Sequence, residues 1–278
     1  MTAQASERGQ PPRSRGRNDA RRNVLQPMKG RKLVAIASGK GGVGKTWFAI
    51  TLCHALARRG RRCLLFDGDL GLANVDIQLG LMPPYDLGSV IGGSMTLGDA
   101  TFDYPLGGFK LIAGLAGSGV LSGLSQRRLL TLGGDLLRAA AGYDHVIVDI
   151  GAGIEAPVRA LTGPAARCLV VVTEEPTALT DAYAFIKLTL ADFPATRFRI
   201  VVNMASSRTN GERTYESLLR ACRSFLGHAP PLAGVVRRDA RVADSIRQQT
   251  PLLTRYPQSE AGADVEVIAH RLIADATP

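Results

Sequence analysis

One octet of the sequence combines glycines with a lysine and a hydroxyl residue at the spacing that phosphate binding requires. Residues Gly39–Thr46 read GKGGVGKT, which fits the phosphate-loop pattern GxxxxGK[ST]. The glycines let backbone N–H groups surround the α- and β-phosphates, because a side chain would block that approach. Lys45 is expected to reach the β- and γ-phosphates, and the Thr46 hydroxyl to bind Mg²⁺. The octet therefore predicts a site for a nucleoside triphosphate and Mg²⁺.

The same residues also satisfy a weaker pattern, that of a dinucleotide-binding loop. Gly39, Gly41 and Gly44 fit GxGxxG, and Asp67 and Asp69 follow near the distance expected for an acid that binds ribose. A lysine and a threonine directly after the last glycine are needed by a phosphate loop and not by a dinucleotide loop. ATP or GTP is therefore favoured over NAD, which remains a distant alternative.

A strand must precede such a loop and a helix must follow it, so that the helix N-terminus points at the anion. Residues 33–37 form a short apolar run typical of a strand, and residues 47–59 have apolar side chains near helical spacing. Similar runs are found at 62–66, 109–113, 145–150, 168–173, 198–203 and 232–236, and helical spacing at 126–141, 180–190, 215–226 and 241–248. This alternation predicts an α/β fold with a doubly wound, mostly parallel sheet flanked by helices.

Acidic residues stand at the carboxyl ends of two predicted strands, the edge where open α/β sheets bind ligands. Asp149 closes the run 145–150 and stands where phosphate-loop proteins place the acid that holds Mg²⁺, directly or through water. Asp67 and Asp69 follow the run 62–66. We predict that Asp69 positions the attacking water and that Asp67 has a metal-binding or structural role.

Composition and charge narrow the class of protein. The 278 residues are 45% hydrophobic, and they include neither an apolar run long enough for a transmembrane helix nor an apolar signal core. Four cysteines and four histidines are scattered without metal-ligand spacing. Of the net charge of +10, residues 1–32 contribute +7, from nine basic and two acidic residues. We therefore expect a cytoplasmic protein with a disordered basic tail over 1–32 and a single domain over 33–278.

Several stretches resemble the MinD/ParA superfamily of ATPases. The phosphate loop of these proteins, called a deviant Walker A motif, has an additional lysine near its start. The octet carries the additional lysine of that loop at Lys40, and DGDLGLANVDIQLGL at 67–81 resembles the first switch of these proteins. Within the superfamily, residues 143–154, 175–188 and 238–257 are similar to the flagellar-number branch of FlhG, FleN and YlxH. The resemblance covers about residues 31–260.

This resemblance implies a molecular switch that dimerises with ATP and becomes a monomer with ADP. Lys40 would reach the phosphates of the partner subunit, and Lys40, Lys45 and Asp69 would form the catalytic set. Asn203 would bind adenine. The complete predicted nucleotide-binding set is Gly39, Lys40, Gly41, Gly42, Val43, Gly44, Lys45, Thr46, Trp47 and Asn203, with Thr46, Asp67 and Asp149 at the metal.

The flagellar branch also implies partners and a place in the cell. Its members engage an FlhF-like GTPase, a transcriptional regulator and switch-complex proteins, and they act in the cytoplasm, at the inner membrane or at the cell pole. Residues 264–274 predict a terminal helix whose short apolar set fits either packing or weak membrane contact. Two other functions stay open: a ParA-like DNA-partitioning ATPase, which the basic tail favours, and a Rossmann oxidoreductase.

Overall fold

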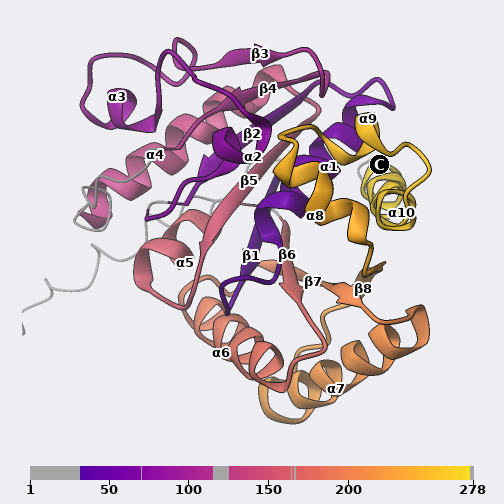
Figure 1. The fold of residues 1–278 in the computed structure, drawn as a ribbon. Coiled ribbons are helices and arrows are strands. Elements are labelled where there is room, and N and C mark those ends of the chain that lie inside the picture. Colours follow the sequence, from indigo (N-terminus) through magenta and orange to yellow (C-terminus); the bar gives the residue numbers. More distant parts are fainter. Residues whose placement is uncertain (1–31, 70, 115–124, 164, 166, 276–278) are drawn as a thin grey trace, which may run out of the picture.

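One eight-stranded sheet forms the centre of the molecule. The computed structural model describes residues 32–69, 71–114, 125–163, 165 and 167–275; the basic tail predicted over residues 1–32 lies outside them except for Lys32. The strand order is β3-β4-β2-β5-β1-β6-β7-β8 (Figure 1). Every pairing is parallel except that of β3 with β4. The prediction of a doubly wound, mostly parallel sheet is confirmed.

The strands are short and nearly all apolar, as is usual for strands buried on both faces. Along β1, Val34 and Ile36 face one side of the sheet, and Leu33 and Ala35 face the other. The strands are β1 (Leu33–Ser38), β2 (Cys63–Gly68), β3 (Phe102–Tyr104), β4 (Phe109–Ile112), β5 (His145–Ala152), β6 (Arg167–Val172), β7 (Arg197–Ala205) and β8 (Leu232–Arg237).

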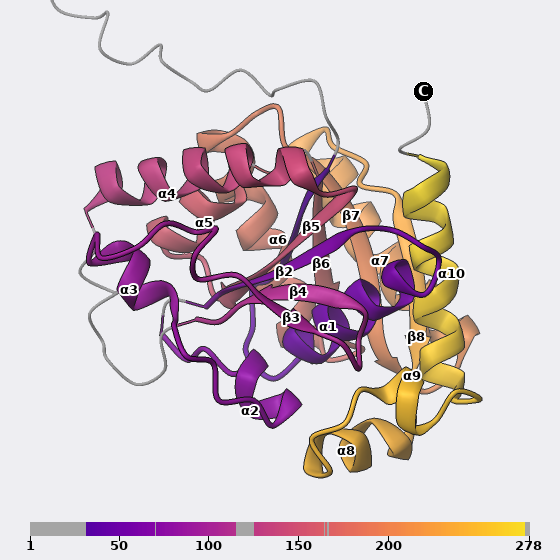
Figure 2. The same ribbon diagram turned by 90° about the horizontal axis from the view of Figure 1, so that it is seen from above.

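Helices cover both faces, so the molecule has three layers (Figures 1 and 2). One layer holds α1 (Lys45–Ala57), α2 (Val75–Leu79), α8 (Ala240–Arg247), α9 (Leu252–Arg255) and α10 (Glu260–Ala274). The other holds α3 (Leu87–Ile91), α4 (Gln126–Ala139) with a 3₁₀ turn at Ala140–Gly142, α5 (Ala156–Thr162), α6 (Pro176–Asp192) and α7 (Arg208–Leu226). Each layer buries its apolar side chains against the sheet, which leaves the carboxyl edge of the strands free for a site.

Some elements differ from the predicted ones. The helix α7 begins at Arg208 rather than near residue 215, because the Ser207 hydroxyl caps it by accepting a hydrogen bond from the Asn210 N–H (3.1 Å). The helix α6 begins at Pro176, a residue that suits the first turn, rather than at 180. The strand β3 and the helices α5 and α9 were not predicted, since each is too short to show a period.

The terminal helix α10 packs against the body of the protein. Its apolar residues Val265, Ile268 and Leu272 are buried between β8 and α1. Residues 264–274 were predicted either to pack against the protein or to contact a membrane weakly. The structure shows packing, and it leaves these side chains unavailable to lipid. Among the described residues, no helix is long and apolar enough to cross a membrane.

Candidate functional site

The phosphate loop turns sharply from β1 into α1. Gly42 and Gly44 have φ of 77° and 83°, a region that glycine adopts without strain. A Cβ on Gly44 would lie 2.5 Å from Asn203 Nδ2, and one on Gly39 would lie 2.1 Å from the Asp181 carbonyl oxygen. The helix begins at Lys45, and the Phe48 N–H donates to the Gly44 carbonyl (3.0 Å). The loop thus forms a compact turn at the N-terminus of a 13-residue helix, where anions bind.

The sheet topology gives this loop two different sides. The strand β1 lies between β5 and β6 in the sheet. Beyond β5 the next strand is β2, and beyond β6 the next strands are β7 and β8. Asp67 and Asp149 belong to β2 and β5, whereas Asn203 belongs to β7. The carboxylates and the ends of β6, β7 and β8 therefore lie on either side of a topological switch point. We name the carboxylate side the phosphate end and the other side the nucleoside end, after the part of a nucleotide that each could hold.

Asp67 holds the loop that follows β2. Its side chain is fully buried, and it accepts hydrogen bonds from the backbone N–H groups of Asp69 (3.2 Å), Asn74 (3.1 Å) and Val75 (3.1 Å). Burial raises the pKa of Asp67 to about 6, although these hydrogen bonds oppose the shift. Both carboxylate oxygens accept hydrogen bonds from the backbone. These contacts fit the structural role predicted for Asp67, and they leave no oxygen for the ribose of a dinucleotide.

Asp149 is paired in register with Asp67 on the neighbouring strand. Burial first, and then the Asp67 charge, raise the pKa of Asp149 to about 8, while a hydrogen bond with Thr46 and the Lys45 charge lower it. Among the described residues, the buried Oδ1 atom of Asp149 has no hydrogen-bond partner. A buried carboxylate oxygen without a partner beside a threonine hydroxyl fits Mg²⁺, which prefers oxygen ligands and retains phosphate and water in its shell.

Lys45 lies between the loop and the acids. Its side chain is 8% exposed, and burial lowers its pKa while Asp149 and Asp69 raise it. A buried ammonium facing two carboxylates is suited to binding an anion inserted between them. The structure therefore brings Lys45, Thr46, Asp69 and Asp149 together, as predicted.

Asp69 faces the carboxyl end of β5. Its Oδ1 accepts hydrogen bonds from the Gly71 (3.1 Å) and Leu72 (3.0 Å) N–H groups. A Cβ on Gly151 would lie 3.1 Å from the same oxygen, and Gly153 has a φ of 117°. The loop after β2 thus meets the carboxyl end of β5 at this carboxylate.

Lys40 is held within its own chain. Its Nζ lies 2.5 Å from Glu175 Oε2 and donates to Thr177 Oγ1 (2.9 Å), with the lysine side chain 36% exposed. Glu175 and Thr177 were not predicted as neighbours of Lys40, and no local pattern could have indicated them, because they are more than 130 residues away in sequence. That Lys40 reaches a partner subunit stays a prediction.

The nucleoside end contains a cavity of about 390 Å³. It is lined by Gly41, Gly42, Val43, Thr173, Glu174, Glu175, Pro176, Met204 and Arg238. Sequence reasoning identified neither Met204, which adopts a positive φ of 54°, nor Arg238. Positive φ is strained for a methionine and is a feature that clusters at ligand sites.

Two predicted nucleotide-binding residues contact the protein itself. Asn203 is buried, and its Nδ2 donates to the Val43 carbonyl (2.8 Å), so it braces the phosphate loop from β7. The Trp47 indole is buried in the core beneath the loop. Its side chain therefore does not reach the cavity, and only its backbone, in the first turn of α1, stays close to the phosphates.

Comparison with known proteins agrees with this geometry. Residues 34–252 match the family model described as the CobQ/CobB/MinD/ParA nucleotide binding domain. The antiactivator FleN of Pseudomonas aeruginosa is 36% identical over 241 residues, which is 87% of this chain and 86% of that protein. The flagellum site-determining protein YlxH of Helicobacter pylori is 28% identical over 244 residues, 87% of this chain and 82% of that protein.

A solved structure shows the same fold. The septum site-determining protein MinD of Pyrococcus horikoshii, complexed with Mg-ADP, superposes with a TM-score of 0.74 at 23% identity, covering 88% of this chain and 97% of that one. The resemblance to the MinD/ParA superfamily and to its flagellar branch is confirmed, and neither the dinucleotide-binding nor the partitioning alternative is favoured. The chain belongs to the CobQ/CobB/MinD/ParA nucleotide-binding domain family.

Proposed function

We propose that this protein is an ATPase switch that regulates the number or placement of flagella. ATP with Mg²⁺ binds at the phosphate loop, two ATP-bound copies associate, and slow hydrolysis separates them. The observation that carries the proposal is the grouping of Lys45, Thr46 and Asp149 at the N-terminus of α1. It combines a buried ammonium, a hydroxyl and a buried carboxylate oxygen that has no partner in the part of the chain that the structure describes. The relative YlxH, named as a flagellum site-determining protein, supports the flagellar role, and FleN belongs to the same branch of similar proteins.

The residues of the site divide the work of phosphoryl transfer. The backbone N–H groups from Gly41 to Thr46 and the Lys45 ammonium hold the α-, β- and γ-phosphates, and Thr46 and Asp149 hold Mg²⁺. The metal supplies positive charge to the β- and γ-oxygens. Asp69 orients a water for in-line attack on the γ-phosphorus, whose bond to the bridging oxygen of ADP breaks. Lys40 leaves Glu175 and reaches the phosphates of the second subunit.

The nucleoside lies toward β7 and β8. Its base and ribose occupy the cavity beside Met204 and Arg238, and the Asn203 amide reaches the base once the nucleotide has entered. The Mg-ADP bound by the MinD of Pyrococcus horikoshii supports adenine as the base and Mg²⁺ as the metal. We assign residues 33–278 to one such domain and residues 1–32 to a basic tail.

The partners follow the flagellar relatives. An FlhF-like GTPase, a transcriptional regulator or a switch-complex protein recognises the ATP-bound dimer, at the pole or at the inner membrane. The name antiactivator for FleN favours a transcriptional regulator among these partners.

The test is to count flagella in a strain that lacks this protein. The proposal expects an altered number or position, restored by the native protein and not by Lys45→Ala at the same cellular level. A normal flagellar count together with chromosome or plasmid loss would replace the flagellar role with a partitioning one. A purified protein that prefers NAD(P) to ATP·Mg²⁺ would overturn the ATPase itself.

A further inference from the structure

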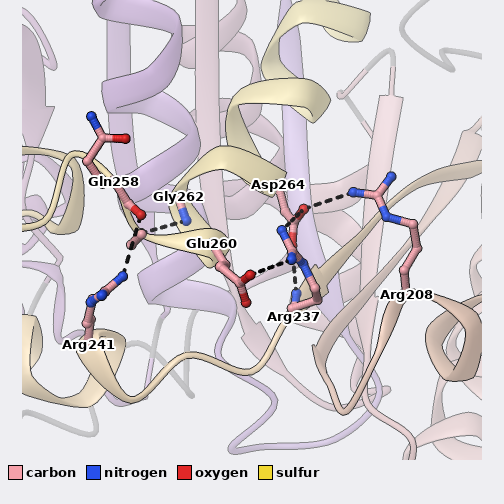
Figure 3. A network of polar contacts seen from close by, with 8 residues as sticks. Arg208, Arg237, Arg241, Gln258, Glu260, Gly262 and Asp264 are labelled. Carbon is pink, nitrogen blue, oxygen red and sulfur yellow. Dashed lines mark hydrogen bonds and ion pairs between the residues drawn. The ribbon is translucent and has the colours of Figure 1, made fainter.

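A buried acid on the terminal helix contacts the loop that lines the nucleoside cavity. Asp264 of α10 is 4% exposed and accepts hydrogen bonds from two arginines. Figure 3 shows Arg237, at the end of β8, and Arg208, at the start of α7, converging on its carboxylate. Three elements that are distant in sequence thus meet at one side chain.

Arg237 donates hydrogen bonds to Asp264 from its backbone as well as from its side chain. The guanidinium binds in a fork, with Nε 2.8 Å from Oδ2 and Nη2 3.1 Å from Oδ1, and the Arg237 backbone N–H also donates to Oδ2 (3.0 Å). Arg208 adds a fourth contact to Oδ1 at 3.2 Å. A forked arginine–carboxylate pair is strong and directional. Here it fixes the backbone of residue 237 as well as its side chain.

The next residue, Arg238, lines the cavity. Its backbone N–H donates to the Ala205 carbonyl (2.8 Å), beside the strained Met204 that lines the same cavity. Two successive backbone N–H groups therefore donate hydrogen bonds to different elements. The Arg237 N–H bonds to α10 and the Arg238 N–H bonds to β7. Together they fix the direction in which the chain leaves β8, and with it the place of Arg238.

We propose that Asp264 is a positioning residue for nucleotide recognition, which acts through the Arg237 backbone to hold Arg238 against the nucleoside. The inference rests on the proposed ATP site and adds to it a support that comes from the last helix. Asp264 touches no nucleotide, and Arg238 makes the contact. The carboxylate therefore affects the nucleoside end, and the phosphate end is independent of it.

The experiment compares two ligands that share the phosphate end only. Binding of ATP and of inorganic tripolyphosphate, both with Mg²⁺, is measured for the native protein, Asp264→Ala, Asp264→Asn and Arg238→Ala by displacement of a fluorescent ATP analogue. Asp264→Ala and Arg238→Ala should each weaken ATP about five-fold, close to 1 kcal/mol, which is typical of one hydrogen bond. Tripolyphosphate should bind as before. Asp264→Asn keeps one acceptor and should fall between native protein and Asp264→Ala.

Glu260→Gln is the matched control, because Glu260 lies one turn earlier on α10 and pairs with Arg237 Nη1 (2.8 Å) from an exposed position. It should change neither affinity. Equal loss for both ligands, or no loss of ATP affinity in Asp264→Ala, would overturn the inference. Should Asp264→Ala not fold, the same comparison on Asp264→Asn decides. Native protein that binds tripolyphosphate as tightly as ATP would also overturn the inference, because the nucleoside would then add nothing, whereas native protein that binds neither ligand would contradict the proposed ATP site.

Discussion

Asp67 and Asp149 occupy the same register position on the neighbouring strands β2 and β5, so two buried carboxylates lie side by side at the phosphate end of the site. Asp67 binds the backbone, whereas Asp149 has a buried oxygen without a partner among the described residues. Burial and the Asp67 charge raise the pKa of Asp149 to about 8. The protonated form of Asp149 therefore persists to higher pH than that of a free aspartic acid.

Binding of Mg²⁺ should depend on pH for this reason. A metal ligand must be ionised, so Mg²⁺ must displace the proton of Asp149. Below the pKa of about 8, the affinity for Mg²⁺ in the presence of ADP should rise about tenfold per pH unit, and it should level off above that pKa. Magnesium titrations between pH 7 and 9, where ADP itself hardly titrates, measure it. Asp149→Asn should bind Mg²⁺ weakly with a flat profile, and a flat profile for the native protein would contradict the prediction.

The same carboxylate should cost stability in the absence of ligand. Its pKa is raised on folding, so the native state holds a proton that the unfolded state releases, and the free energy of unfolding falls as the pH rises from about 4 to about 8. Asp149→Asn has no proton to lose. At pH 8.5 its Tm should exceed that of the nucleotide-free native protein, by about 2–4 °C for each kcal/mol of unfolding free energy that the ionised carboxylate costs. The difference should shrink toward pH 5. A lower Tm for the variant at pH 8.5 would contradict the prediction, because the ionised Asp149 side chain would then stabilise the fold.

Lys45→Ala should abolish nucleotide binding. The change removes the buried ammonium that faces Asp149 and Asp69, and leaves those acids opposite the incoming phosphates. Isothermal titration with ATP·Mg²⁺ should show no measurable heat of binding. Lys110→Ala is the control, because Lys110 is partly exposed and pairs with Asp103 (3.5 Å) on the strands β3 and β4, outside the site. Retained affinity in Lys45→Ala would remove the phosphate loop from the site.

The glycine-rich turn between β1 and α1 could be predicted from the sequence because its determinants are local. Glycines at 42 and 44 with positive φ, followed by a lysine at the start of a helix, form a pattern of consecutive residues. The acids at the ends of β2 and β5 could be placed next to the loop because parallel strands share one carboxyl edge.

The nucleoside end was predicted poorly because its determinants are distant in sequence. Asn203 bonds to Val43 across 160 residues and Lys40 to Glu175 across 135, and neither contact leaves a period or motif. The same holds for Arg238, whose place depends on contacts from β7 and α10. The family resemblance suggested adenine binding for Asn203, whereas in the structure its amide holds the phosphate loop through Val43.

Lys40→Ala should weaken dimerisation without weakening the fold. The Lys40–Glu175 pair is exposed, and such pairs contribute little to stability, so the Tm should stay within about 1 °C of the native value. Sedimentation with a non-hydrolysable ATP analogue should show a dimer for the native protein and a monomer for the variant at equal concentration. Glu175→Gln leaves Lys40 in place but removes its anionic partner, and it should keep the dimer. An unchanged dimer in Lys40→Ala would mean that Lys40 does not cross the interface.

Asp69→Ala should separate binding from hydrolysis. The Asp69 carboxylate lies where the loop after β2 meets the end of β5, and its Oδ1 holds the turn at Gly71 and Leu72. Without it the attacking water loses its acceptor, so single-turnover phosphate release should fall by about 10²-fold or more, while ATP binds and the dimer persists. Asp69→Asn keeps an oxygen that can hold the turn and lacks the charge, so it should bind ATP like the native protein and hydrolyse it as slowly as Asp69→Ala. Native turnover in Asp69→Asn would assign the residue to the turn alone, and loss of ATP binding in both variants would place it at the phosphates instead.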